Sequence, residues 1–367
     1  MTKPNSKCKV AIVGAGPSGI YCALWLEKLG NVATDIYEKS SPLKTLLPTG
    51  GTRCNLSHHA ESISDFVKNY PRGEKFLYSI FSKHFVYDSL DYFNSIGIET
   101  YMQSDNRYFP TSNSSSDMRQ KMLKALKRSK IIKQNITDIH QLNKYDYIVI
   151  STGSKDNYRL ASNSGHTIVE PKPALCGLKL APNSPKYPQG VVLNTHDGEI
   201  LFTKDGVSGP YIYKISSLKA RDNFPYDITV PLIPAENLFQ NVKENPKKSF
   251  GSIVSGYIPK SLAHVILCDK YSMRCADVKK IQIQNLATIT FKVISTDNKG
   301  EIVTSGGVSL DEINNFCQSK INEKIFFCGE VMNIDGLCGG YNLQHCWSSA
   351  FCAASGIINH LTQRKNL

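Results

Sequence analysis

Two glycine-rich stretches at opposite ends of this 367-residue sequence have residue types that suit ligand binding. Near the N-terminus, residues 14–19 follow a short apolar run. Near the C-terminus, Gly339 and Gly340 lie directly before the last expected helix, and Glu330 and Asp335 precede them at close spacing. A loop that only connects two elements rarely requires two acids and paired glycines. We therefore expect this loop, too, to bind a ligand.

The N-terminal stretch matches the pattern GxGxxG in the setting that a dinucleotide requires. The apolar run before it is expected to be a buried strand, a helix should start near Pro17, and a second strand should end at Glu38. Gly14 allows a tight turn, Gly16 lets the backbone approach a pyrophosphate, and Gly19 permits close packing of helix on strand. Free N–H groups at the helix start suit phosphates, and Glu38 suits the adenosine ribose. These elements together predict a dinucleotide-binding site.

A strand that returns near the C-terminus indicates which dinucleotide binds. Thr152 and Gly153 end a strand and resemble the turn that closes the dinucleotide domain of two-domain flavoproteins. Upstream, "IIKQNITDI" resembles the strand whose backbone contacts adenine in that class, with Ile136 as the contact residue. About 170 residues after Gly153, the segment "KIFFCGE" is expected to form a further strand. An NAD dehydrogenase has no general need for such an element, whereas FAD extends further from the first strand–helix–strand unit, so the pattern favours FAD.

The C-terminal stretch suits the distal part of FAD. Glu330 could bind a ribityl hydroxyl, and Gly339 and Gly340 would bring helix N–H groups against the pyrimidine edge of the flavin. The alternative is a glycine-rich turn before an ordinary core helix, which the matching N-terminal site makes the weaker interpretation. The residues expected to bind the cofactor are Gly14, Gly16, Pro17, Ser18, Gly19, Glu38, Lys39, Gly51, Arg53, Asn55, Ile136, Thr152, Gly153, Gly329, Glu330, Asp335, Gly339, Gly340, Tyr341 and Asn342.

Composition and charge restrict the cellular setting and the partners. A hydrophobic content of 41% and a charged content of 20% are ordinary for a soluble globular protein, and the net charge of +12 points to anionic partners. Glycines interrupt the apolar stretch near the N-terminus that otherwise resembles a secretory signal, and no segment reaches the ~20 apolar residues of a membrane span. We expect a cytoplasmic protein that does not enter a membrane. Its oligomeric state is not readable.

The eleven cysteines do not suggest a metal site. None belongs to a CxxC pair, and Cys268 and Cys275 are isolated from histidines. Most lie among apolar or small residues and are expected to be reduced thiols that pack as small hydrophobic side chains.

Six motifs follow one another in the order found in one flavoprotein family. "GAGPSG" is the first. "TGGTRCNLSH" is similar to Gly-Gly-Gly-Arg-Cys-Asn-Leu-Thr-Asn, "NRYFP" to Gly-Arg-Val-Phe-Pro, and "LFTKDGVSGP" to Phe-Thr-His-x-Gly-Leu-Ser-Gly-Pro. "VTSGGVSLDEI" resembles Val-Thr-x-Gly-Gly-Val, and the stretch after Cys328 resembles Gly-Glu-x-x-Asp-x-x-Gly-x-x-Gly-Gly-Tyr-Asn-x-Gln. The chain thus resembles the BaiN/RdsA-type NAD(P)/FAD-dependent oxidoreductases, which include aminoacetone-oxidase-like flavoproteins.

The resemblance implies an α/β fold with an FAD-binding Rossmann-like domain of the glutathione-reductase type, made in two parts from residues 1–155 and 306–367. Residues 156–305 would form an inserted β-rich substrate domain with a helical piece near residues 236–267. The chain departs from the family pattern at two places. Thr52 replaces the third glycine of one motif, and a glycine-rich stretch that many relatives carry after Gly153 is missing. Both departures bear on the entrance to the site and on the substrate.

Three residues are candidates for catalysis. Cys54 could donate a proton beside a double bond that is being reduced, or it could be a small packing residue. Arg53 could reach the cofactor or a substrate carbonyl, or it could form a surface ion pair. Tyr341 could face the flavin or lie in the core. No second GxGxxG is present in the insertion. Either NAD(P)H visits the flavin transiently as donor, or the substrate reduces FAD and oxygen reoxidises it.

The segment "DMRQKMLKALKRSK" has six Lys or Arg residues between positions 119 and 130, with Met118, Met122 and Leu126 spaced as a buried stripe. A solvated helix face is the default interpretation. A surface for RNA phosphates is the sharper one, because the resemblance implies RNA-uridine reduction among the family's activities.

Several functions stay open from the sequence. The main prediction is an FAD-dependent oxidoreductase that transfers a hydride to or from a C=C or C–N bond. Its substrate could be a uridine in ribosomal RNA, a small amine such as aminoacetone, or a polycyclic enone, and the positive charge favours RNA. An amine oxidase that uses oxygen and a non-catalytic flavin-binding protein are the alternatives.

Overall fold

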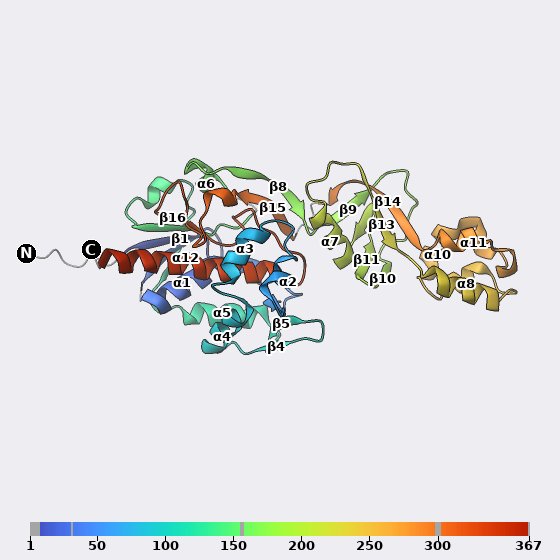
Figure 1. The fold of residues 1–367 in the computed structure, drawn as a ribbon, viewed down its shortest axis with the longest axis horizontal. Coiled ribbons are helices and arrows are strands. Elements are labelled where there is room, and N and C mark those ends of the chain that lie inside the picture. The colour runs from blue at the N-terminus through green and yellow to red at the C-terminus, as the bar shows by residue number, and fades with distance from the viewer. Residues whose placement is uncertain (1–7, 31, 155–157, 298–301, 366–367) are drawn as a thin grey trace, which may run out of the picture. The chain divides into compact units, whose positions relative to one another are not determined.

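The protein forms two compact units, which are described separately (Figure 1). The computed structural model describes residues 8–30, 32–154, 158–297 and 302–365. Unit 1 contains the described residues up to 172 and those from 304 onward, and unit 2 contains those in 173–303. The chain therefore leaves unit 1 once and returns to it. The boundary expected at residues 155–156 lies outside the described residues.

Unit 1 is built on a five-stranded parallel sheet with strand order β16-β7-β1-β2-β6. Its strands are β1 (Val10–Val13), β2 (Thr34–Glu38), β6 (Lys130–Lys133), β7 (Tyr147–Ile150) and β16 (Ile325–Phe327). Every residue of β1, β7 and β16 is buried, as expected of parallel strands covered on both faces. Because β16 comes from the C-terminal part of the chain and pairs with β7, the predicted two-part Rossmann-like fold is confirmed.

Two helices that are distant in sequence pack against each other in unit 1 (Figure 1). They are α1 (Pro17–Gly30) and α12 (Tyr341–Lys365). Aromatic side chains join them: the rings of Tyr21 and Trp347 have centroids 5.2 Å apart, and those of Trp25 and Phe351 4.7 Å apart. The two glycine-bearing turns lie at the N-terminal ends of these helices, so the packing of the helices positions both turns.

Smaller elements complete unit 1. Helical elements are η1 (Lys44–Leu46), α2 (Ile63–Val67), α3 (Glu74–Phe81), α4 (Val86–Ser95), α5 (Ser115–Ala125), η2 (Ile139–Leu142), α6 (Arg159–Asn163) and η6 (Leu310–Glu312). A small antiparallel sheet has the order β3 (Ser57–His58), β5 (Arg107–Pro110), β4 (Thr100–Met102). A two-stranded sheet pairs β8 (Ile168–Ala174) with β15 (Val303–Val308), and most residues of both strands belong to unit 1. None of the described helices combines the length and apolarity that crossing a bilayer requires.

Unit 2 consists of a six-stranded antiparallel sheet and a helical piece with a common hydrophobic core. The strand order is β10 (Val192–Thr195), β11 (Gly198–Phe202), β12 (Gly206–Ser208), β9 (Gly177–Leu180), β14 (Thr288–Asp297), β13 (Tyr226–Pro231). The helical elements are α7 (Pro210–Leu218), α8 (Ala235–Glu244), α9 (Phe250–Val254), α10 (Lys260–Leu267), η3 (Cys268–Ser272), η4 (Cys275–Asp277) and α11 (Lys280–Gln284). The insertion is β-rich as predicted, but its helical piece continues past the expected end at residue 267.

Candidate functional site

The first glycine turn is held by backbone packing. Gly14 has φ +105°, and its N–H donates to the carbonyl oxygen of Tyr37 at 2.8 Å. A Cβ atom at Gly14 would overlap the carbonyl oxygen of Ser151, and one at Gly19 would overlap the carbonyl oxygen of Gly14. The Ser151 hydroxyl fixes the same point by donating to the Gly14 carbonyl at 2.9 Å. Glycine is required at both positions because the strand ends and the helix approach each other closely.

Gly16 shows a different requirement. Among the described residues a Cβ atom there would meet only the Thr45 hydroxyl oxygen, at 3.9 Å, so packing against them does not explain this glycine. Gly16 lies just before Pro17, the first residue of α1, where backbone N–H groups lack partners inside the helix and the helix dipole favours anions. A pyrophosphate that approaches the backbone at Gly16 accounts for the missing side chain, so the turn fits a dinucleotide.

Glu38 at the end of β2 is fixed beside this turn. Its Oε2 accepts from the Ala15 N–H at 2.9 Å, and its Oε1 accepts from the N–H and the hydroxyl of Ser40, both at 2.8 Å. Oε1 thus accepts two hydrogen bonds and Oε2 only one, so Oε2 can still accept from a ribose hydroxyl. Lys39 is exposed next to it, and the buried Ile136 lies beyond the end of β6.

The C-terminal segment closes directly onto the first turn. Gly329 has φ +75°, and a Cβ atom there would overlap the Ser18 hydroxyl. That hydroxyl donates to the Cys328 carbonyl at 3.3 Å, and the Gly329 N–H donates to the Ser349 hydroxyl at 2.9 Å. Half-buried Glu330 follows at once. The structure thus brings together Ser18 and Gly329, which lie near opposite ends of the sequence.

The backbone just after β7 has free space beside it at Gly153. Thr152 and Gly153 follow the strand directly, and Gly153 has φ +74°. A Cβ atom at Gly153 would meet no atom of the described residues within 4 Å. As at Gly16, the backbone here is accessible to a ligand.

The segment around residue 53 has an unusual backbone. Gly50, Gly51, Thr52 and Cys54 all have φ between +58° and +70°. Thr52 has the left-handed conformation at the position where the motif that this segment resembles has glycine, although a β-branched residue is strained there. Its carbonyl accepts from the Ser115 N–H at 2.8 Å, which helps to hold the strained loop.

This loop lies against the second glycine turn. A Cβ atom at Gly340 would be 2.6 Å from the Ser57 carbonyl oxygen and 2.8 Å from Asn55 Oδ1. Asn55 is only 8% exposed, and its Oδ1 is buried without a hydrogen-bond partner in the part of the chain that the structure describes. Trp347 anchors α12 here by donating from its indole N–H to the Leu56 carbonyl at 3.0 Å. An orphaned acceptor beside the N-terminus of α12 fits a ligand that presents an N–H group, as the flavin pyrimidine ring does.

His58 holds the turn from the other side. Its Nδ1 lies 3.1 Å from the Gly339 carbonyl, so this nitrogen donates and carries the proton. The His58 ring stacks on Tyr341, with centroids 4.9 Å apart, and burial lowers the pKa of His58. Burial likewise raises the pKa of Tyr341 to about 12, and the Tyr70 hydroxyl donates to the Tyr341 carbonyl at 2.7 Å. The Tyr341 ring is therefore part of an aromatic cluster at the start of α12.

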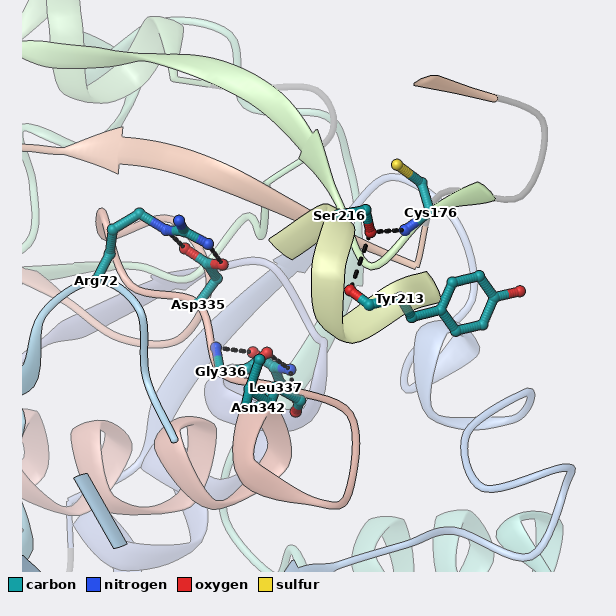
Figure 2. A network of polar contacts seen from close by, with 8 residues as sticks. All are labelled: Arg72, Cys176, Tyr213, Ser216, Asp335, Gly336, Leu337 and Asn342. Carbon is teal, nitrogen blue, oxygen red and sulfur yellow. Dashed lines mark hydrogen bonds and ion pairs between the residues drawn. The ribbon is translucent and has the colours of Figure 1, made fainter. Parts of the chain in front are cut away.

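Asp335 and Asn342 stabilise the second turn with their side chains (Figure 2). Asp335 is fully buried, and the guanidinium of Arg72 donates to both of its carboxylate oxygens. Asn342 Oδ1 accepts from the Gly336 N–H, and its Nδ2 donates to the Gly336 carbonyl, both at 2.8 Å. These contacts hold the turn through both side chains.

The side chains of Cys54 and Arg53 contact residues outside the second glycine turn. Cys54 is fully buried with its Sγ 3.4 Å from the sulfur of Met118, and burial raises its pKa to about 12. Arg53 donates to Gln103 Oε1 at 3.4 Å, and its guanidinium lies 4.3 Å from the ring centre of Phe109. The geometry of Cys54 favours a packing role over proton donation.

The basic segment near residue 119 is partly tied to unit 1. Met118 and Met122 of α5 are fully buried as predicted, whereas Leu126, the third residue of the expected stripe, is only half-buried and follows the end of the helix. Arg119 donates to the Pro42 carbonyl at 2.9 Å, and Lys121 pairs with Asp117 at 3.0 Å. Lys124, Lys127, Arg128 and Lys130 are exposed.

Two residues of the site were missed in the sequence. His58 lies inside the "TGGTRCNLSH" motif, so its position beside the expected site was a usable signal. Arg72 had no signal, because its partner Asp335 is 263 positions away.

Comparisons with known proteins agree with this geometry. A family model described as "HI0933-like protein Rossmann domain" matches residues 8–155 and 147–356. The chain is 23% identical to a 3-dehydro-bile acid delta(4,6)-reductase of Clostridium scindens, over 94% of this chain and 98% of the relative. It is also 23% identical to the ribosomal RNA dihydrouridine synthase of Haemophilus influenzae, over 94% of this chain and 97% of the relative. The Escherichia coli enzyme of the same name is 23% identical, over 95% and 97%.

Proposed function

This chain belongs to the HI0933-like protein family, and we propose that it is an FAD-dependent oxidoreductase that reduces a C=C bond. Within that class we propose uridine in ribosomal RNA as substrate and NAD(P)H as transient electron donor. The names of the relatives support this, since a reductase and a dihydrouridine synthase both add hydrogen to their substrates. The net charge of +12 supports an anionic substrate. An rRNA substrate would place the enzyme in the cytoplasm.

The observation that carries the proposal is the closure of the C-terminal segment onto the first turn at Ser18 and Gly329. An NAD-binding unit alone does not need this second glycine-bearing element. FAD needs it because its ribityl chain and ring system extend beyond the diphosphate.

Each part of the cofactor has a proposed set of contacts. Backbone N–H groups of the first turn would bind the diphosphate, Glu38 the adenosine ribose, and the backbone near Ile136 the adenine. Glu330 would bind a ribityl hydroxyl. Asn55 Oδ1 would accept a hydrogen bond from the pyrimidine ring, and the backbone at Gly340 would lie against its edge.

FAD, when bound, supplies the hydride chemistry. The chain supplies binding and electrostatics. The N-terminus of α12 bears a partial positive charge, so it favours negative charge at the pyrimidine edge. Asp335 is already paired with Arg72 and Asn342 with Gly336, so we propose that these two side chains position the turn.

Cys54 is the candidate acid that can be tested most directly. Because its thiol is buried against Met118, we expect Cys54→Ala to bind FAD and to turn over at the wild-type rate. Loss of turnover with FAD still bound would instead support proton donation by Cys54.

The deciding experiment is an absorption spectrum of the purified protein with FAD, followed by anaerobic addition of NADPH. A flavin spectrum that bleaches with NADPH supports the reductase. Bleaching by aminoacetone, with peroxide formed in air, would support an amine oxidase instead. Protein that binds FAD but is reduced by neither donor would indicate a binding role, and failure to bind FAD would contradict the proposal.

A further inference from the structure

The helical piece of unit 2 has a concentration of positive charge that the proposed flavin site does not use. Between residues 243 and 280 the sequence has eight Lys or Arg and three Asp or Glu residues, a net charge of +5. All eight cations are exposed. This short segment therefore has a strongly positive surface.

The cations of the helical piece also have no ion-pair partner among the described residues. None of the ion pairs found between described residues involves any of the eight. Glu244, the nearest acid in sequence to Lys243, accepts a hydrogen bond from Gln240 at 2.6 Å. On α5, by contrast, Lys121 is paired with Asp117 and Arg119 is bonded to Pro42. Unpaired cations retain their full attraction for an external anion.

Backbone pairing gathers several of these cations into one place. The Cys275 N–H donates to the Lys248 carbonyl at 3.0 Å, and Ser249 forms a β-bridge with Arg274. Lys247, Lys248 and Arg274 therefore lie on adjoining segments. Lys279 and Lys280 follow η4, which packs against α8 together with α11. We call Lys243, Lys247, Lys248, Arg274, Lys279 and Lys280, which these backbone contacts and the packing of α8, η4 and α11 bring into one region, the 243–280 surface.

Exposed apolar side chains lie beside this charge. Phe239 on α8 is 42% exposed and Ile281 on α11 is 57% exposed. Phe239 and Lys243 are four residues apart on one helix, so they share a face. Aromatic rings next to cations are the combination on which unpaired bases stack while phosphates are neutralised.

We propose that the 243–280 surface, together with Phe239, is an RNA-docking surface of this protein. Lysines and Arg274 would bind phosphates, and the exposed ring of Phe239 would stack on an unpaired base. This inference rests on the proposed function, in which ribosomal RNA is the substrate, and it assigns the RNA contact to unit 2. Unpaired positive charge favours RNA over a protein partner, for which an apolar surface with little charge would be expected.

The first experiment measures how RNA affinity depends on salt. The full-length protein is titrated with a fluorescein-labelled RNA hairpin that has uridines in a single-stranded loop. The triple variant Lys247→Gln, Lys248→Gln, Arg274→Gln should bind at least about ten-fold more weakly at low salt. Its slope of log K against log salt should be smaller by about 2, since each lost phosphate contact removes about 0.7.

Two further variants separate local contacts from total charge. Lys179→Gln, Lys186→Gln, Lys204→Gln removes the same charge from exposed lysines elsewhere in unit 2 and should keep the wild-type slope. Phe239→Ala should weaken binding about ten-fold with no change of slope, because it removes stacking and no charge. Circular dichroism and FAD binding confirm that each variant is folded.

Each outcome decides the matter. A larger loss in the 243–280 variant than in the matched lysine variant, together with the Phe239 effect, supports the docking surface. Equal losses in both triple variants, or wild-type affinity in all of them, overturn it and leave Phe239 and Ile281 to a protein partner. If the wild-type protein binds FAD but no RNA, the RNA-docking inference is wrong and the flavoenzyme proposal is unaffected. If the wild-type protein binds RNA but no FAD, only the flavoenzyme proposal is wrong.

Discussion

The turn at residues 14–19 and the turn at residues 335–340 each precede a helix, yet different forces hold them. The first is fixed mainly by close backbone packing, of Gly14 on the Ser151 carbonyl and of Gly19 on the Gly14 carbonyl, and by the side chains of Ser151 and Glu38 at the adjoining strand ends. The second is fixed by side chains from elsewhere: Arg72 on Asp335, and His58 on the Gly339 carbonyl.

This difference has consequences for stability and for ligand binding. A turn made by backbone packing should tolerate changes in distant side chains but not the addition of a single methyl group. A turn held by side chains should respond to the loss of any one partner and to protonation of its surroundings. Variants that affect one turn and spare the other therefore test the comparison.

Arg72→Leu should have the largest effect. It leaves the fully buried Asp335 carboxylate without its charged partner, which costs about 4 kcal/mol of unfolding free energy. Urea unfolding measures this loss. The control is Lys68→Leu, whose partner Asp65 is as exposed as Lys68 itself, so the change should be below about 1 kcal/mol. Equal changes in the two variants would show that the second turn does not depend on the buried pair.

Acid should also affect the helix that bears the second turn. Burial lowers the pKa of His345 to about 4 and that of His84, which stacks on Phe351 of α12, to about 3. An unfolded histidine titrates near 6.5, so below this pH the unfolded state binds protons that the native state does not. Stability should therefore fall as the pH drops from 6.5 toward 4, by up to about 1.4 kcal/mol per pH unit for each histidine.

Urea unfolding at a series of pH values measures this dependence. His84→Gln removes one titrating group, so its stability should vary less steeply with pH than that of the wild type. Parallel pH profiles for the two proteins would show that His84 is not held neutral by its burial.

Glycine substitutions in the first turn should separate packing from ligand binding. A methyl group at Gly19 overlaps the Gly14 carbonyl, so Gly19→Ala should lose about 2 kcal/mol of stability without any ligand. Gly16→Ala should keep the unfolding free energy of the FAD-free protein, because its Cβ would meet only Thr45, yet it should bind FAD more weakly. Unaltered FAD affinity in Gly16→Ala would mean that no ligand approaches this position.

The same contrast explains what could be predicted from the sequence. Gly14 and Gly19 belong to a local pattern whose physical requirements are met within one strand–helix unit, so their positions follow from spacing alone. The strand that precedes Gly329 could be assigned to the same sheet, because a short apolar run followed by glycine is typical of a buried parallel strand. The structure pairs this strand, β16, with β7. These features predicted the α/β dinucleotide-binding part of the fold, whereas the inserted β-rich domain was implied by the family resemblance.

The side-chain contacts of the second turn could not be predicted in this way. Nothing near Asp335 in sequence indicates Arg72, and the aromatic cluster around Tyr341 gathers rings from several elements. Cys54 likewise resembled a reactive thiol in its motif, although only the fold shows that Met118 covers it. Contacts between distant segments depend on packing, which local patterns do not record.

The smallest expected effect concerns His58. His58→Ala removes one hydrogen bond to the Gly339 carbonyl, worth about 1 kcal/mol, so FAD affinity should fall about five-fold. Related sequences have asparagine at this position of the motif, and an asparagine amide can also donate, so His58→Asn should restore most of the affinity. The control is His59→Ala, since His59 bonds to the Tyr87 hydroxyl and not to the turn. Fluorescence titration with FAD measures all three. If His58→Ala binds FAD as tightly as the His59 variant, the turn is held without this contact, and the second turn resembles the first more closely than its geometry indicates.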